Sequence, residues 1–196
     1  MTADGDDDGF VSLAFSTSKI LSGELHDVDK EVEYTVGTVK RGSTRLTTAL
    51  REPGAGKEPT ALIDWRARLF EISGHRKRVV EMKSTKGAFS SSRYWSWFDE
   101  EEYRVKYSAE MAHTWTLYSY TGDVLATLTS AVHRLLAQNS LPVLRIASTV
   151  TDEDERRFIV LVLLYSETKR LESVKERPIS VVADLLEILP FPSASR

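Results

Sequence analysis

The stretch DEDERRFIVLVLLYSETKR (Asp152–Arg170) decides the fold of this 196-residue chain. Eight apolar residues run without a break from Phe158 to Tyr165, with acids before them and two bases after them. That order suits the partial charges of a helix, which are positive at its start and negative at its end. A short apolar run can also be a buried strand, and three β-branched residues favour that reading. Length and charge order favour a helix over about 152–171.

A helix that is apolar on every side has no face for water, so other elements must surround it. Its eight apolar residues rise roughly 12 Å, far less than the ~30 Å hydrocarbon core of a bilayer. The stretch therefore predicts a buried core helix and no transmembrane segment.

The residues before this helix form a series of short apolar or alternating segments separated by polar turns. Regular spacing of this kind is typical of sandwiches and barrels. We predict a mainly β (α+β) fold, a closed antiparallel β-barrel of roughly 9–12 strands around the central helix. The expected strands include Glu33–Val39, Thr44–Leu50, Ala61–Ile72, Arg78–Met82, Arg93–Phe98, Tyr103–Tyr107, Trp115–Ser119, Val124–Thr129 and Leu141–Ala147.

Three regions follow from this pattern. Residues 1–9 are acidic and are expected to be a disordered tail, and residues 10–172 form the barrel with its helix. Residues 173–196 are expected to hold a short amphipathic helix over Ile179–Leu189 and a loose tail.

Composition limits the functional classes. The net charge of −3 gives no reason to expect nucleic acid as a partner. The absence of cysteine excludes disulfides and thiolate sites and favours a reducing compartment. The first ten residues, MTADGDDDGF, lack the basic and apolar parts of a signal peptide. We therefore expect an intracellular, cytoplasmic protein, with peripheral membrane attachment as an option.

Several motifs resemble a known family. The resemblance is to a fungal family of unknown function that is grouped with the tubby C-terminal-like fold, beside tubby proteins, phospholipid scramblases and plant LURP-one-related proteins. It covers about residues 10–172 and rests on the apolar run with its following SETKR, and on Ile63-Asp64-Trp65, Tyr103-Arg104-Val105-Lys106-Tyr107 and Trp115-Thr116-Leu117. It implies a closed antiparallel barrel around a hydrophobic helix.

The function that this resemblance implies is less direct. Tubby proteins bind phosphoinositides, whereas scramblases are membrane proteins with acylated cysteines and a calcium site. This chain has no cysteine and no calcium-loop pattern, so the resemblance does not extend to scramblase activity.

A basic band is the most prominent charge feature. Between Lys40 and Arg93, thirteen Lys or Arg stand against five Asp or Glu, a surplus of eight positive charges in a chain of net −3. Such a band could hold anionic lipid headgroups, meet another anion, or be scattered around the barrel. The candidate lipid-binding residues are Arg66, Arg68, His75, Arg76, Lys77, Arg78 and Lys83.

An aromatic run, Tyr94-Trp95-Ser96-Trp97-Phe98, offers a second candidate surface. Alternation places Trp95 and Trp97 on one face of a strand. They could contact a partner protein, or they could be core residues.

Enzyme signatures are weak. Gly54-Ala55-Gly56-Lys57 lacks the first glycine and the Ser or Thr of a phosphate-binding loop. The four histidines are far apart, and the acids of 99–102 are typical of a solvated loop. We predict no catalytic residue, cofactor or metal site. The leading hypothesis is a non-enzymatic module for anionic lipid headgroups, the alternative is a protein-interaction module, and an unrecognised enzyme is third.

Overall fold

The computed structural model describes residues 9–86, 92–97, 101–131 and 140–175. The predicted helix Ile179–Leu189 and most of the predicted acidic tail lie outside these ranges. The described elements, in chain order, are β1 (Phe10–Phe15), β2 (Gly23–His26), β3 (Val32–Arg41), β4 (Thr44–Arg51), β5 (Ala61–Asp64), β6 (Leu69–Ile72), β7 (His75–Arg78), α1 (Val79–Met82), β8 (Lys83–Ser84), β9 (Arg93–Trp95), β10 (Tyr103–Ser108), β11 (Thr114–Tyr118), β12 (Val124–Thr129), β13 (Val143–Ala147) and α2 (Glu153–Lys175).

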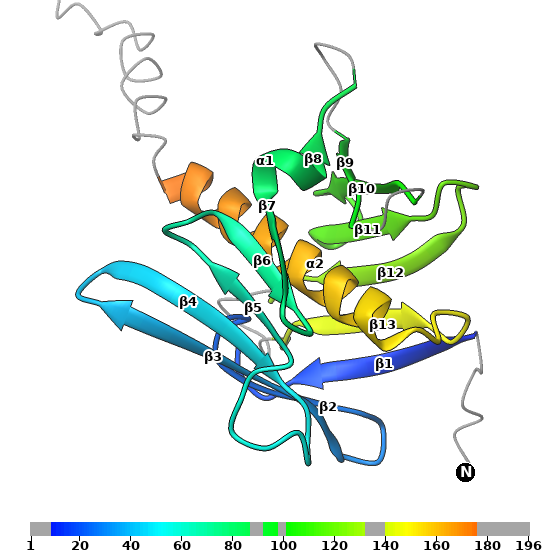
Figure 1. Ribbon diagram of the computed structural model, residues 1–196. Coiled ribbons are helices and arrows are strands. Elements are labelled where there is room, and N and C mark those ends of the chain that lie inside the picture. Colours follow the sequence, from blue (N-terminus) through cyan, green and yellow to red (C-terminus); the bar gives the residue numbers. More distant parts are fainter. Residues whose placement is uncertain (1–8, 87–91, 98–100, 132–139, 176–196) are drawn as a thin grey trace, which may run out of the picture.

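All thirteen described strands belong to one antiparallel sheet. The strand order is β7-β6-β5-β4-β3-β2-β1-β13-β12-β11-β10-β9-β8, so the first and last strands pair in its middle. Figure 1 shows this sheet curving around α2. The prediction of a mainly β fold with many short antiparallel strands is thus confirmed.

The closed barrel of the prediction is not confirmed, because the sheet of described strands has two edges. Among the described strands, β7 and β8 are the two edges and share no ladder. The expected strand Arg78–Met82 is instead the short helix α1, which turns the chain from one edge to the other. Lys77 on β7 reaches across and donates a hydrogen bond to the backbone carbonyl of Trp97. We call this place, between β7 and β8, the edge junction.

Helix α2 begins as its sequence predicts and is slightly longer than expected, ending at Lys175 rather than near 171. Asp152 caps it, because its carboxylate accepts a hydrogen bond from the Glu155 amide at 2.8 Å. Every residue from Phe158 to Thr168 is buried, with no exposed side. The all-apolar run therefore occupies the hollow of the sheet, as predicted.

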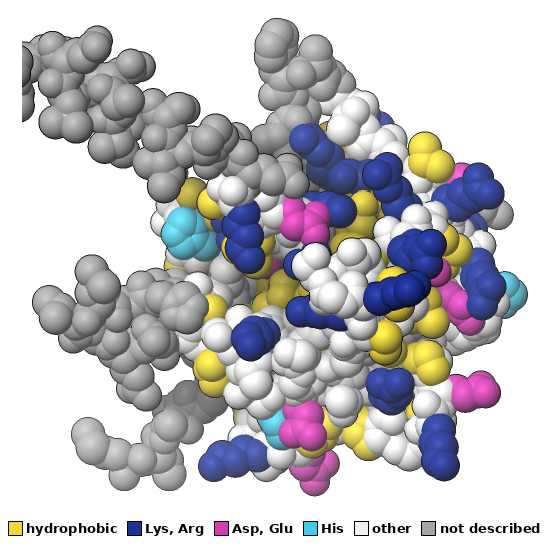
Figure 2. Space-filling model, turned by 90° about the vertical axis from the view of Figure 1, so that its left-hand side faces the viewer, with side chains coloured by type: hydrophobic (Ala, Val, Ile, Leu, Met, Phe, Trp, Pro, Cys, Tyr) yellow, Lys and Arg dark blue, Asp and Glu magenta, His cyan; other side chains and the backbone are white. Residues whose placement is uncertain are grey.

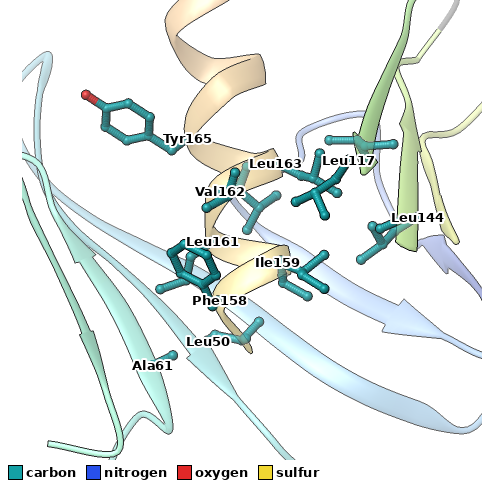
Figure 3. Close-up of a cluster of buried hydrophobic side chains, with 14 of the residues drawn as sticks. Leu50, Ala61, Leu117, Leu144, Phe158, Ile159, Leu161, Val162, Leu163 and Tyr165 are labelled. Carbon is teal, nitrogen blue, oxygen red and sulfur yellow. The ribbon is translucent and has the colours of Figure 1, made fainter. Parts of the chain in front are cut away.

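Strands on different sides of α2 contribute the side chains of the core. Figure 3 shows Leu50 and Ala61 on one side of the helix and Leu117 and Leu144 on another. These strand residues point inward at every second position, since successive side chains of a strand alternate between its faces. Burial of each large apolar side chain contributes roughly 1.5–3 kcal/mol before entropy is subtracted.

Ion pairs fix the first turn of α2 against the sheet. Arg157 binds both carboxylate oxygens of Glu52, at 2.7 and 2.8 Å, and also Asp154 at 2.6 Å. Hydrogen bonds from Arg157 to Glu52 raise the pKa of its guanidinium, so the group stays charged. These contacts tie the start of α2 to Glu52, which follows β4.

Candidate functional site

The end of the molecule at which α2 emerges from the sheet combines aromatic rings with basic side chains. We call it the exit face; it comprises the last turns of α2, the turn 65–68, the strand ends near Lys40 and Arg45, α1 and Lys83. Figure 2 shows this side, where Lys and Arg side chains surround a hollow that contains hydrophobic side chains.

An aromatic cluster forms the base of the exit face. Tyr165 of α2 stacks on Trp65, with ring centroids 5.4 Å apart and planes 6° from parallel. It also meets Phe70 and Trp95 edge to face, at 5.6 Å each. Offset stacked and edge-to-face pairs are the favoured aromatic geometries. The cluster thus joins α2 to both edges of the sheet.

Local hydrogen bonds hold Trp65 in the turn between β5 and β6. The Asp64 carboxylate accepts hydrogen bonds from the amides of Arg66 and Ala67 at 2.9 and 2.8 Å. This Asx-type turn is a common use of Asp after a strand. The indole nitrogen of Trp65 donates to the Thr48 hydroxyl at 2.8 Å, which fixes the ring over Tyr165.

Basic side chains lie over these rings. The Arg45 guanidinium is 5.6 Å from the Trp65 centroid, and the Lys169 ammonium is 5.8 Å from both Trp65 and Tyr165. Lys83 lies 5.4 Å from Trp95 and 5.8 Å from Tyr165. Cations within about 6 Å of an aromatic centroid are attracted to the ring.

The charges on the exit face are only partly paired. Burial opposes ionisation of Glu172, yet hydrogen bonds from Lys169 and Arg45 lower the pKa of its carboxyl. Burial lowers the pKa of the Lys83 ammonium, and the charges of Arg93 and Lys169 lower it further. Among the described residues, Lys83 has no carboxylate partner. The face therefore keeps uncompensated positive charge.

A buried carboxylate lies below this surface. Glu167 is 2% exposed and accepts hydrogen bonds from Trp115 at 2.9 Å, Ser130 at 2.7 Å and Arg170 at 2.7 and 2.8 Å. Arg170 also lies over the Tyr107 ring at 4.8 Å. Because four donors satisfy Glu167, its charge is not available to repel an anion at the surface.

The structure splits the predicted basic residues into two groups. The exit face includes four of them: Arg66, Arg68, Arg78 and Lys83. Arg78 pairs with Leu69 beside the turn 65–68. The Val79 amide donates a hydrogen bond to the Arg68 carbonyl at 2.8 Å, which holds α1 beside the same turn. The other predicted members do not join them.

His75 and Arg76 lie toward the opposite end of the sheet. His75 is close enough to Asp154, in the first turn of α2, to affect the pKa of that carboxyl. Arg76 pairs with Glu71 at 2.7 Å. Lys77 points into the edge junction. The seven residues therefore do not form one patch, because His75 lies at the start of β7, toward Asp154, and Arg78 at its end, beside the turn 65–68.

The predicted partner-contact residues are core residues, which corrects that assignment. Trp95 is 0% exposed and Trp97 is 5% exposed. Trp95 packs against Phe70 and Tyr165, and Trp97 packs against Phe158 at 5.7 Å. They share a face as alternation predicts, but that face is the inner one, so neither ring is available to a partner in this conformation.

The site also includes residues that sequence reasoning left out. Lys169 follows Tyr165 by four positions, so helical periodicity could have placed it over that ring. Arg45 and Trp65 come together only through the pairing of β4 with β5, for which the sequence holds no local signal.

Two other kinds of site have no support in the part of the chain that the structure describes. No three His, Asp or Glu side chains there gather closely enough to hold a metal ion. Neither of its helices is long and apolar enough to cross a bilayer.

Comparisons with known proteins give one similarity. No family model and no curated protein matches the chain. Among solved structures, it is similar to the X-ray structure of a protein from Arabidopsis thaliana, with 13% sequence identity and a TM-score of 0.47, over 82% of this chain and 91% of that one.

Proposed function

We propose that this chain is a non-enzymatic binding module that recognises the anionic headgroups of membrane lipids with its exit face. One observation supports this most: the ammonium groups of Lys83 and Lys169 each lie 5.8 Å from the centroid of the same ring, that of Tyr165. The charge of Lys169 helps to lower the pKa of the Lys83 ammonium, so the two cations repel each other, and a bound phosphate would relieve that repulsion.

The exposed arginines at the rim extend the same attraction. Arg66, Arg68 and Arg78 are all exposed on the exit face. Each base near an anionic membrane surface contributes about 1 kcal/mol, so three contribute about 3 kcal/mol, or roughly 150-fold in affinity. Among the rings below, Trp65 is partly exposed and supplies hydrophobic surface of the kind found at membrane interfaces.

We also propose that the chain shares the tubby C-terminal-like fold. The support is an antiparallel sheet of thirteen described strands around a helix that is buried from Phe158 to Thr168, as the sequence resemblance implies. On this proposal the edge junction, spanned by α1 and by the hydrogen bond from Lys77 to Trp97, stands where a barrel would close. The proposed location is the cytoplasmic surface of a membrane.

Vesicle flotation tests the lipid proposal. Vesicles of phosphatidylcholine alone would be compared with vesicles that contain about 10% phosphoinositide, at ~0.15 M salt, where surface charge still acts over about 8 Å. We expect recovery of the protein with the phosphoinositide vesicles only, and release at 1 M salt. Equal recovery with both kinds of vesicle would contradict the proposal.

A further inference from the structure

A pocket beside the last turns of α2 adjoins the aromatic cluster through Arg45, which lines the pocket and lies over the Trp65 ring. Its cavity volume is about 570 Å³, and it lies between α2, the segment 18–22, β3 and β4. Sites for small molecules usually have volumes of about 300–1,000 Å³. The pocket is therefore large enough for a small organic ligand.

The lining of the pocket has a surplus of positive charge. Five basic residues line it, against two acids, Glu167 and Glu172. Both acids are occupied, Glu167 by its four donors and Glu172 by Arg45 and Lys169. Among the described residues, the remaining bases of the lining have no carboxylate partner; they are Lys19, Lys40 and Lys175.

The partial negative charge at the C-terminal end of α2 reduces this surplus of positive charge only in part. A helix C-terminus carries about half a negative charge, and Lys175 in the last turn offsets it. Lys19 lies in the connection between β1 and β2 and Lys40 lies in β3, and both side chains are exposed. Their ammonium groups can turn toward a ligand in the pocket.

The pocket also has apolar surface. Ile20, Leu21 and Leu171 contribute to its lining, and Leu171 is 41% exposed although it is a large apolar side chain. A ligand with an apolar body would remove this surface from water. Since the hydroxyl of Thr38, another lining residue, already donates to the Leu21 carbonyl at 2.7 Å, the wall is held in place before a ligand arrives.

We propose that this pocket binds a small amphipathic anion, in which a single carboxylate or phosphate is attached to an apolar chain. The acidic group would lie by Lys19 and Lys40, and the chain would contact Ile20 and Leu171. A purely apolar molecule would leave the cations unmatched, and an inorganic anion would leave Leu171 exposed. Both parts of the ligand are needed.

Isothermal titration calorimetry with four probes tests this proposal on the full chain. The probes are octanoate, octyl phosphate, octanol and inorganic phosphate. We expect one molecule of octanoate or octyl phosphate to bind with a Kd below about 1 mM, and the other two probes to bind at least about tenfold more weakly. The tighter of the two anionic amphiphiles identifies the acidic group. Octanol binding as tightly as either would overturn the proposal, as would no binding by any probe.

Variants locate the binding. The double substitution Lys19→Glu with Lys40→Glu should weaken binding of the anionic amphiphile about tenfold, and Leu171→Glu should weaken it similarly. Arg104→Glu with Lys106→Glu makes the same change of charge at exposed positions of β10 and should leave the Kd unchanged. Equal effects of the two double variants, or none from either, would refute the assignment to this pocket.

Ligand binding in the pocket and lipid binding at the exit face can be tested independently. Reversal of Arg66, Arg68 and Arg78, which do not line the pocket, should leave binding of octanoate unchanged. Loss of vesicle binding with intact octanoate binding would therefore separate the two sites.

Discussion

Arg170 donates two hydrogen bonds to the carboxylate of Glu167, from Nε at 2.7 Å and from Nη2 at 2.8 Å, one turn apart in α2. The indole of Trp115 and the hydroxyl of Ser130 complete the shell of this buried group. The carboxylate thereby ties α2 to β11 and to the residue that follows β12.

Removal of Glu167 should therefore be costly. Glu167→Ala leaves the partly buried guanidinium of Arg170 and two buried donors without an acceptor, and should lower the free energy of unfolding by about 3 kcal/mol. Urea denaturation measures this. Glu172→Ala is the matched control on the same helix: its partly exposed pairs with Arg45 and Lys169 contribute about 1 kcal/mol or less. Equal losses for both variants would contradict the account.

A charge placed in the middle of α2 should prevent folding. Val162 is 0% exposed, so Val162→Asp buries an unpaired carboxylate that costs several kcal/mol, against a total stability of about 5–15 kcal/mol. Soluble yield and thermal melting report the outcome. Val174→Asp makes the same change at a position of α2 that is 56% exposed, and should melt within a few degrees of the unmodified chain. A near-normal melting temperature for Val162→Asp would show that α2 is not enclosed.

The pair of acids at Tyr103 predicts a pH effect. The Tyr103 hydroxyl lies 2.6 Å from Glu101 and 2.9 Å from Glu155, and can donate its one proton to only one of them. Burial raises the pKa of Glu155 above 4.5, and the nearby charges of Glu101 and Asp152 raise it further. The native state therefore binds this proton more tightly than the unfolded state does.

The sign of the effect follows from that difference. Glu155 should destabilise the fold above its native pKa, and this penalty should decrease as the pH falls through that pKa toward 4.5. Glu155→Gln should therefore be more stable than the unmodified chain at pH 7, and the difference should shrink toward pH 4.5. Urea denaturation at several pH values measures it, with Glu110→Gln as an exposed control. A destabilised Glu155→Gln at pH 7 would contradict the assignment.

Lys77 should hold the edge junction together. Its ammonium binds the Trp97 carbonyl, and the Ser96 amide donates to the Met82 carbonyl at 2.9 Å close by. Lys77→Met should speed hydrogen exchange at the Ser96 amide by about tenfold or more, since a hydrogen bond to a charged group contributes about 1.5–3 kcal/mol. Arg76→Met, on the exposed side of β7, is the control. Equal exchange in both variants would show that Lys77 does not stabilise this junction.

Much of the architecture could be predicted because its signals are local. The apolar run with acids before it and bases after it specifies α2, and alternation specifies β10 and β11. Turns such as Ser73-Gly74, both with positive φ, mark where β6 reverses into β7. Alternation also placed Trp95 and Trp97 on one face, but could not tell the inner face from the outer one.

The rest depends on pairing between distant segments. The turn at Gly74 sends β7 back along β6, so that Arg78 returns beside the turn 65–68 while His75 stays at the far end of the hairpin. The open edges of the described sheet could not be predicted either, since α1 replaces an expected strand between them. The assembly of Arg45, Lys83 and Lys169 around Tyr165 and its neighbours likewise requires three elements to meet, and no periodicity within one segment encodes that.

The most direct measurement for the central claim is the partitioning of charge-reversed variants onto phosphoinositide vesicles at ~0.15 M salt. One triple variant reverses the exit face (Arg66→Glu, Arg68→Glu, Arg78→Glu), and a second makes an equal change of charge elsewhere (Arg76→Glu, Arg104→Glu, Lys106→Glu), all at exposed positions. We expect the first to bind at least about 100-fold more weakly than the unmodified chain. We expect the second to bind within about threefold of it. Equal weakening of both, or unchanged binding of the first, would contradict recognition of lipid headgroups by the exit face.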